Sequence, residues 1–227
     1  MAGTNFPKVW AYMLAGVLVA GLLAATVFTP GVAAQDPGCK GDILLDPGHG
    51  GNDTGAVNKT YNLKESEEVL KVAAHLKALL EADGHTVCTT RTTNSETLSN
   101  NDRYTYANTT GAEILVSIHM NGSSNTATDY TTILFGKWRK DKKLAYALLG
   151  DLSALPAASG TGTIAARDPY SFASGVLLES DMPATIAETV FITNDKEGRL
   201  LSNGTGARQQ QIAEALRKGI EGYLSTH

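Results

Sequence analysis

Apolar runs with the spacing of β-strands alternate along this chain with stretches whose apolar residues recur at helical spacing. The helical pattern is clearest in residues 65–82, where Val69, Val72 and Leu76 share one face with several later apolar residues. Strand-like runs occupy residues 43–45, 86–90, 113–119, 130–135, 176–179 and 184–188, and helix-like stretches occupy residues 65–82, 101–108, 140–155 and 207–224. Such alternation is typical of α/β proteins. We therefore predict one α/β domain with a twisted, mostly parallel or mixed sheet of about six strands flanked by helices.

Residues 1–34 differ in composition from the rest of the chain. Lys8 is their only charged residue, and residues 9–28 form an unbroken uncharged run that is followed by a Pro-Gly pair and small residues up to Ala34. This pattern is typical of a secretory signal that is cleaved near Ala34. The uncharged run is also long enough to cross a bilayer as a retained anchor. Both alternatives predict an exported protein, whether secreted, periplasmic or associated with a cell wall.

Charge and cysteine content narrow the class of protein further. The chain has 19 basic and 23 acidic residues, and residues 1–34 contribute only one lysine to this balance. An acidic domain gives no electrostatic reason to expect a nucleic-acid partner. Cys39 and Cys88 both lie beyond residue 34, and an even number of cysteines in an exported chain favours a disulfide between them. Two buried free thiols are the alternative.

Residues able to perform chemistry lie at the ends of separate predicted strands. His49 follows the first strand in a glycine-rich turn, His119 ends the third strand, and Glu188 ends the last one. Because the functional crevice of an α/β sheet lies at the carboxyl ends of its strands, we expect these residues to converge on one edge. Glu65, at the start of the first long helix, can fold back to the same edge. Two imidazoles and a carboxylate are a common ligand set for catalytic zinc.

Several short motifs occur in an order that is typical of one enzyme family. They are Asp46-Pro47-Gly48-His49-Gly50-Gly51, Glu65 with Leu70 and Ala73, Thr90-Arg91, Arg103 with Ala107-Asn108, Ser117-Ile118-His119-Met120-Asn121, and Met182-Pro183-Ala184-Thr185-Ile186-Ala187-Glu188 with Phe191 and Asn194. On these residues, the chain from about Ile43 to Leu224 resembles the zinc-dependent N-acetylmuramoyl-L-alanine amidases, which cut bacterial cell wall. Each motif alone is weakly to moderately specific, whereas their joint order is highly specific.

The resemblance implies that residues 35–227 are a zinc amidase domain, which cleaves the amide bond between N-acetylmuramic acid and L-alanine in peptidoglycan. It assigns His49, Glu65 and His119 as ligands of one Zn²⁺ per chain, and Glu188 as the catalytic acid and base. Imidazole and carboxylate ligands suit a metal that polarises a carbonyl and acidifies water. A separate carboxylate can then move the proton. Glu67 or Glu68 remains an alternative to Glu65 as the ligand.

Other polar residues are candidates for binding the substrate. Arg91, Arg103 and Arg167 can each present a guanidinium fork to a carboxylate of the stem peptide. Arg91 and Arg103 are equally good candidates for structural ion pairs. Asn121 follows His119 and either contacts the substrate or holds the turn through backbone hydrogen bonds. We expect a monomer that binds the stem peptide and the muramic acid of peptidoglycan. If residues 9–28 are retained, they would also tether the protein to a membrane.

One departure from the family pattern keeps other functions open. Val190 stands two residues after Glu188, where the family usually has glycine, and a larger side chain there would crowd the pocket or alter the backbone. One alternative is therefore a catalytically weak or inactive regulator that binds peptidoglycan. A zinc peptidase that cuts within the stem peptide is another, because the metal ligands alone do not determine which amide bond is cleaved.

Overall fold

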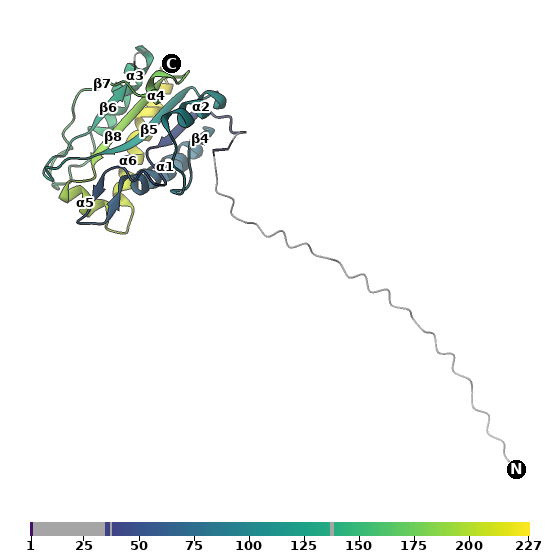
Figure 1. The fold of residues 1–227 in the computed structure, drawn as a ribbon, viewed down its shortest axis with the longest axis horizontal. Coiled ribbons are helices and arrows are strands. Elements are labelled where there is room, and N and C mark those ends of the chain that lie inside the picture. Colours follow the sequence, from purple (N-terminus) through teal and green to yellow (C-terminus); the bar gives the residue numbers. More distant parts are fainter. Residues whose placement is uncertain (2–34, 37, 137–138) are drawn as a thin grey trace. The chain divides into compact units, whose positions relative to one another are not determined.

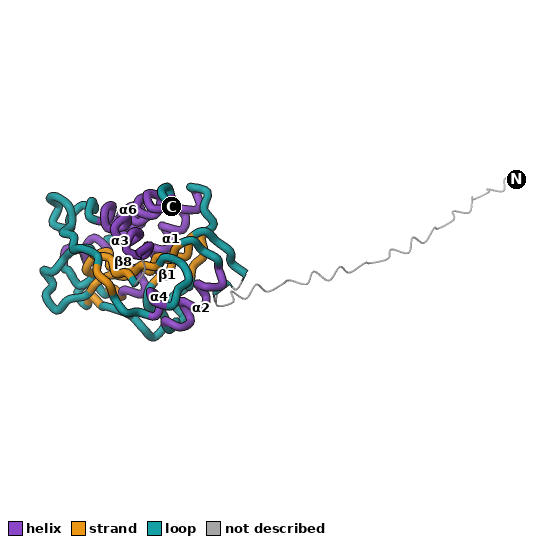
Figure 2. The backbone as a smooth tube through the Cα atoms, turned by 90° about the horizontal axis from the view of Figure 1, so that it is seen from above, coloured by secondary structure: helices purple, strands orange, loops and turns teal. Residues whose placement is uncertain are grey.

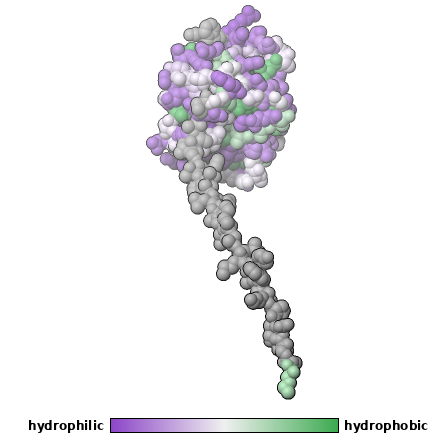
Figure 3. All heavy atoms as spheres, turned by 90° about the vertical axis from the view of Figure 1, so that its right-hand side faces the viewer, coloured by the Kyte–Doolittle hydropathy of each residue, from purple (hydrophilic) through white to green (hydrophobic). Residues whose placement is uncertain are grey.

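The structure, a computed structural model, describes residues 1, 35–36, 38–136 and 139–227. The signal or anchor predicted at residues 1–34 therefore lies, apart from Met1, outside the described residues. Within the described ranges, no helix is both long and apolar enough to cross a membrane. The face of the domain seen in Figure 3 is mainly hydrophilic, and its hydrophobic residues form small separate patches.

A six-stranded sheet lies at the centre of the domain, with strand order β4-β1-β5-β8-β6-β7. The strands are β1 (Ile43–Pro47), β4 (Val87–Thr89), β5 (Ile114–Asn121), β6 (Thr132–Phe135), β7 (Tyr170–Ser171) and β8 (Ala184–Phe191). Figure 1 shows β5 and β8 side by side in the middle of this sheet. β6 runs antiparallel to β8, while the other neighbouring strands are parallel. The predicted α/β domain with a mostly parallel sheet of about six strands is confirmed.

Helices cover both faces of the sheet, as Figure 2 shows. The larger layer consists of α1 (Glu65–Ala82), α3 (Arg139–Leu152) and α6 (Ala207–Leu224), and the smaller one of α2 (Asn100–Thr110) and α4 (Gly175–Leu178). Successive strand residues alternate between two cores: Ile43 and Leu45 pack under the larger layer, and Leu44 packs under the smaller one. Because both faces are buried, the central strands read as continuous apolar runs.

Some elements differ from those predicted. Residues 176–179, predicted as a strand, belong largely to the one-turn helix α4, because a short apolar run does not distinguish a strand from a buried helix. The sixth strand is instead β7, which lies in the predicted loop 156–174. The hairpin of β2 (Val57–Asn58) and β3 (Leu63–Lys64) and the helix α5 (Asp195–Leu201) were not predicted, since they are too short to show a periodic apolar pattern.

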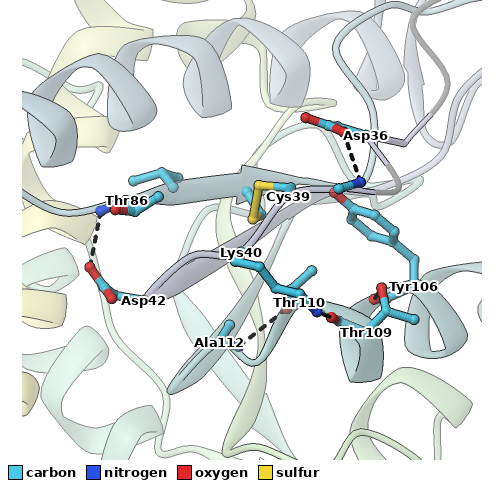
Figure 4. Close-up of a disulfide and its surroundings, with 12 residues drawn as sticks. Asp36, Cys39, Lys40, Asp42, Thr86, Tyr106, Thr109, Thr110 and Ala112 are labelled. Atoms are coloured by element: carbon cyan, nitrogen blue, oxygen red, sulfur yellow. Dashed lines mark hydrogen bonds between the residues drawn. A yellow bond between two sulfur atoms is a disulfide. The ribbon is translucent and has the colours of Figure 1, made fainter.

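Cys39 and Cys88 form a disulfide, which confirms the predicted pairing over the alternative of free thiols. The bond joins the segment before β1 to β4, and Cys88 pairs in the sheet with Leu44 of β1. Figure 4 shows the two sulfur atoms, with Tyr106 of α2 close by. Cys88 and Tyr106 belong to the smaller core. The disulfide therefore ties the edge strand β4 to the segment that leads into β1.

Candidate metal centre

His49, Glu65 and His119 meet at the carboxyl end of the sheet, although they come from three different elements. His49 lies in the turn after β1, His119 lies near the end of β5, and Glu65 is the first residue of α1. Glu65 Oε1 is 3.0 Å from His49 Nε2 and 3.0 Å from His119 Nδ1. The ligand atoms of all three residues lie within 4.8 Å of one another. The structure thus brings together the three residues predicted to hold a metal.

The turn after β1 holds His49 in an unusual backbone conformation. Its φ is 59°, in the left-handed region that residues other than glycine adopt rarely and often at functional sites. Two neighbouring glycines leave room for the cluster. A Cβ on Gly48 would lie 2.2 Å from a ring atom of His119, and a Cβ on Gly55 would lie 2.6 Å from atoms of both His49 and Glu65. Gly48 and Gly55 therefore allow the backbone to approach the candidate ligands closely.

Glu65, rather than its neighbours Glu67 and Glu68, is the carboxylate of the cluster. Its side chain is 4% exposed. Glu65 Oε2 accepts a hydrogen bond from the N–H of Ala56 at 2.8 Å, and Oε1 accepts one from the N–H of Met120 at 3.0 Å. Glu67 instead pairs with a surface lysine, and Glu68 contacts another lysine and a buried glutamine of α6. Backbone donors on both sides thus orient Glu65 toward the two imidazoles.

Asp53 also contributes to the site, although it was not among the predicted residues. Its Oδ2 lies 2.8 Å from His49 Nδ1, and its Oδ1 accepts a hydrogen bond from the N–H of Gly55. A carboxylate on one ring nitrogen fixes the tautomer and orientation of a ligand histidine. Here it leaves Nε2 to face Glu65 and the metal position. The signal in the sequence was an aspartate four residues after the histidine of the glycine-rich turn.

The charges of the cluster shift the pKa values of its members. Burial by itself lowers the pKa of His49, but hydrogen bonds to Glu65 and Asp53 outweigh burial and raise this pKa to about 9. Burial raises the pKa of Glu65, whereas its hydrogen bonds to His119 and His49 lower this pKa to about 2. Glu65 is therefore ionised at neutral pH, as a carboxylate that binds a metal must be.

The donor set fits zinc. Ligand atoms about 2.1 Å from a tetrahedral zinc ion lie roughly 3.4 Å from one another, and the cluster has this scale, with its closest ligand atoms 3.0 Å apart. Imidazole nitrogens and a carboxylate oxygen are ordinary zinc ligands. The side chains of His49 and His119 are 22% and 20% exposed, so a substrate can approach the cluster from solvent. This access is typical of catalytic rather than structural zinc sites.

Glu188 lies next to the cluster on the neighbouring strand. It pairs in register with His119, and directly paired residues of adjacent strands point to the same face of a sheet. Burial raises the pKa of Glu188; the charge of His119 opposes this effect, and the charge of Glu65 adds to it. A carboxyl group with a raised pKa beside a metal site is suited to accept and return a proton.

Val190 does not enter this pocket. The pairing of β8 with β5 shifts register after Glu188, so that His119 pairs with Glu188 but Asn121 pairs with Phe191. Val190 is fully buried in the larger core, beneath α1, α3 and α6, on the face of the sheet opposite Glu188. The valine thus fills the core, and the crowding that its size led us to expect does not occur.

Arg91 and Arg103 are buried beneath the turn that carries His49. Arg91 is 1% exposed and donates hydrogen bonds to the carbonyls of Pro47 and Gly48. Arg103 forms an ion pair with Asp46 at 2.5 Å and also donates to the carbonyl of His49. These contacts favour the structural alternative for both arginines. They satisfy carbonyls that the sharp turn leaves without partners in the sheet.

Arg167 and Asn121 lie in other surroundings. Arg167 is exposed, and its guanidinium carbon is 3.7 Å from the centre of the Tyr130 ring. Asn121 is half-buried at the end of β5, where its carbonyl accepts a hydrogen bond from the N–H of Ile192. Of the three predicted arginines, Arg167 is thus the one whose guanidinium faces solvent.

Comparison with known proteins agrees with this geometry. The Amidase_3 family, described as N-acetylmuramoyl-L-alanine amidase, matches residues 43–222. The N-acetylmuramoyl-L-alanine amidase AmiA of Escherichia coli is 29% identical over 231 residues, which cover 84% of this chain and 78% of the relative. The probable cell wall amidase LytH of Staphylococcus saprophyticus is 30% identical over 184 residues, which cover 81% of this chain and 58% of the relative.

A solved structure shares the same fold. The crystal structure of an N-acetylmuramoyl-L-alanine amidase from Clostridium difficile 630 matches with a TM-score of 0.72 and 31% sequence identity, covering 81% of this chain and 96% of that one. The family match extends over most of the chain and includes every residue of the metal cluster. The chain therefore belongs to the N-acetylmuramoyl-L-alanine amidase family.

Proposed function

We propose that this protein is an exported zinc amidase, which hydrolyses the amide bond between N-acetylmuramic acid and L-alanine in peptidoglycan. The observation that carries the proposal is the meeting of His49, Glu65 and His119, with Glu188 one strand away on the same face of the sheet. Family membership supports the substrate class. The disulfide supports export, because such bonds persist in oxidising compartments.

The residues of the site divide the chemistry between them. His49, Glu65 and His119 would hold a zinc ion, which supplies Lewis acidity toward the scissile carbonyl and toward a water molecule. Glu188 accepts a proton from the attacking water as the new C–O bond forms. It then donates this proton to the nitrogen of L-alanine as the C–N bond breaks, so the products are a lactyl carboxylate and a free stem peptide. Proton transfer of this kind is worth about 10²- to 10⁴-fold in rate.

Arg167 is our candidate for binding a carboxylate of the stem peptide. The backbone N–H of Arg167 donates a hydrogen bond to the carbonyl of Thr131. The next residue, Thr132, pairs with Glu188 in the sheet. The Arg167 side chain is exposed and is held against the Tyr130 ring. A guanidinium group held in one orientation suits bidentate binding of a carboxylate. Arg91 and Arg103 would contribute indirectly, by holding the turn that presents His49.

The experiment that tests this function is digestion of purified peptidoglycan with the zinc-loaded protein, with the products identified by mass spectrometry. We expect free stem peptides that begin with L-alanine, together with glycan strands stripped of peptide. Glu188→Gln should abolish both products while zinc remains bound at one ion per chain, because Glu188 is not a metal ligand. Loss of zinc in this variant would contradict the separate role given to Glu188.

Two other outcomes would change the proposed function. Cuts inside the stem peptide would identify a zinc peptidase that uses the same metal ligands. Absence of products with zinc fully bound would identify a peptidoglycan-binding regulator. The observation that motivated a regulator was the size of Val190, and the burial of this side chain in the larger core removes the expected crowding of the pocket.

A further inference from the structure

Two exposed aromatic side chains lie together at the β7 edge of the sheet. Five large hydrophobic residues are exposed in the part of the chain that the structure describes, namely Met1, Val57, Tyr146, Tyr170 and Phe172. Tyr170 is 51% exposed and Phe172 is 48% exposed. Phe172 prolongs β7 by donating its N–H to the carbonyl of Phe135 on β6. Residues two positions apart on an extended strand point to the same side, so these two rings are neighbours.

The sheet register places this pair on the same face as Glu188. Glu188 on β8 pairs with Thr132 on β6, and Leu134, two residues further along β6, pairs with Tyr170. Leu134 belongs to the smaller core, on the α2 and α4 side of the sheet. Tyr170, Leu134 and Glu188 therefore share this side. β7 lies two strands from β8, which corresponds to about 10 Å.

Electrostatics agrees with this placement. Burial raises the pKa of the Tyr170 hydroxyl, and the charge of Glu188 raises it further while that of Arg167 opposes the increase. Arg167 itself is stacked on Tyr130. Tyr170 therefore lies within reach of the charges of Glu188 and Arg167, and Phe172 extends the exposed aromatic pair two residues further along the sheet edge.

The chemistry of the proposed substrate explains why aromatic rings would be exposed here. The muramyl ring is joined to the scissile carbonyl through only one ether oxygen and one carbon, so a glycan strand must pass close to Glu188. A pyranose ring presents a face of C–H groups with hydroxyl groups around its rim. Such a face packs flat against an aromatic ring, whose π surface is negative, while the rim stays solvated. Exposed apolar patches beside a catalytic site commonly bind ligand.

We propose that Tyr170 and Phe172 form a stacking platform for N-acetylhexosamine rings of the glycan strand. The strand would run along β7, while the stem peptide lies at the metal cluster and Arg167. This inference rests on the proposed amidase function and specifies which part of the polymer the β7 edge recognises. It predicts that the domain binds glycan strands from which the peptides have been removed.

The test is a calorimetric titration of the zinc-loaded protein with peptide-free glycan strands, which contain no scissile amide. We expect Tyr170→Ala and Phe172→Ala each to weaken binding by about tenfold or more, and Tyr170→Phe to retain most of it because the ring remains. Tyr146→Ala is the matched control. Tyr146 is 46% exposed on α3, in the helix layer that covers the opposite face of the sheet. Its loss should leave glycan binding unchanged.

Hydrolysis of peptidoglycan provides an independent readout. We expect the platform variants to raise KM for polymeric peptidoglycan more than they lower kcat, with the zinc content and thermal unfolding of the wild type retained. If the wild type does not bind peptide-free glycan, or if the platform variants bind it as tightly as the wild type, the proposed stacking platform is wrong. Failure of the amidase function would appear separately, as wild-type digests without free stem peptides.

Discussion

Asp53 illustrates how one residue outside the three candidate ligands can orient one of them. It contacts His49 Nδ1 at 2.8 Å, so the other ring nitrogen is directed at the metal position. We expect Asp53→Ala to weaken zinc binding by about 10- to 100-fold, because the ring of His49 is then free to rotate or to change tautomer. Competition with a chromogenic chelator measures the affinity directly.

The matched control is Asp181→Ala, which removes an exposed aspartate just before β8, at the end of the strand remote from Glu188. It should leave zinc affinity unchanged. Equal zinc affinities for wild type and Asp53→Ala would show that the turn alone orients His49.

Asp46 is a fully buried carboxylate whose partners come from other elements of the chain. It accepts hydrogen bonds from the hydroxyls of Thr90 and Ser117, both at 2.6 Å, and pairs with Arg103. Burial raises the pKa of Asp46, but the charge of Arg103 and these hydrogen bonds outweigh burial and lower the pKa below 3.8. Asp46 thereby links β1, β5, α2 and the residue that follows β4 beneath the turn of His49.

This lowered pKa makes the stability of the fold depend on pH. The unfolded chain takes up the proton first as the pH falls through about 4, so the stabilisation from Asp46 is complete above that pH and is lost below it. We expect Asp46→Asn to lower the free energy of unfolding at pH 7 by about 3 to 5 kcal/mol, because Arg103 loses its buried partner. Urea unfolding between pH 7 and pH 3 should show a shallower acid dependence in this variant.

Ser117→Ala serves as the milder comparison for Asp46. It removes a single hydrogen bond, at a cost of about 1 kcal/mol, and keeps the ion pair. Its stability should therefore follow pH much as that of the wild type does. Parallel acid dependences for wild type and Asp46→Asn would exclude Asp46 as a source of acid instability.

At the scale of elements, the turn between β1 and the β2–β3 hairpin determines how close the ligands lie. A methyl group on Gly48 would overlap the His119 ring. We expect Gly48→Ala to displace His119 and to lower zinc affinity and amidase activity by at least tenfold. Gly150→Ala is the matched control, because an added Cβ at this position of α3 meets no atom within 4 Å.

Gly150→Ala should raise stability by about 0.5 to 1 kcal/mol, since alanine is the better helix former, and should leave zinc affinity as it is. Isothermal titration with zinc and thermal unfolding distinguish the two variants. Unimpaired zinc binding in Gly48→Ala would mean that the turn adjusts without moving His119.

The long elements of the fold were predictable, and the short ones were not. Residues 65–82 and 207–224 have enough periodic apolar positions to define helices, and both are observed over the predicted ranges. Residues 176–179 are mostly apolar and bounded by turns, a pattern that fits a strand and a buried helix equally well. In the structure they lie largely in the helix α4, which packs against α2 and β8. β7 has only two residues, so its place in the sheet depends on pairing with β6.

For the whole molecule, the disulfide is the main covalent restraint. It joins residues 49 apart in sequence and fastens the edge strand β4. We expect the double substitution Cys39→Ser and Cys88→Ser to lower the free energy of unfolding by about 4 kcal/mol, the chain-entropy value for a loop of this size. Urea unfolding of the two proteins measures the difference.

Reduction of the wild type with a thiol should produce the same loss of stability, while the double variant should not respond to the reductant. Equal stabilities of wild type and double variant would show that the disulfide contributes nothing beyond the packing of Cys88 in the smaller core.

The sequence by itself determined the α/β class, the long helices and the candidate ligands His49 and His119, and it narrowed the third ligand to Glu65, Glu67 or Glu68. These features depend on local periodicity, on residue type and on the order of short motifs, all of which can be read along one chain. Glu188 was also identifiable, because it ends the strand predicted at residues 184–188 and stands in a family motif, although β8 continues to Phe191 in the structure.

Only the tertiary structure decided which side chains face one another. Whether Val190 crowds the pocket depends on a register shift between β5 and β8, and whether Arg91 and Arg103 are available to a substrate depends on their burial beneath the turn of His49. The neighbourhood of Tyr170 and Glu188 likewise arises from strand order. Register, burial and strand order are set by contacts between residues far apart in sequence, and no local pattern encodes them.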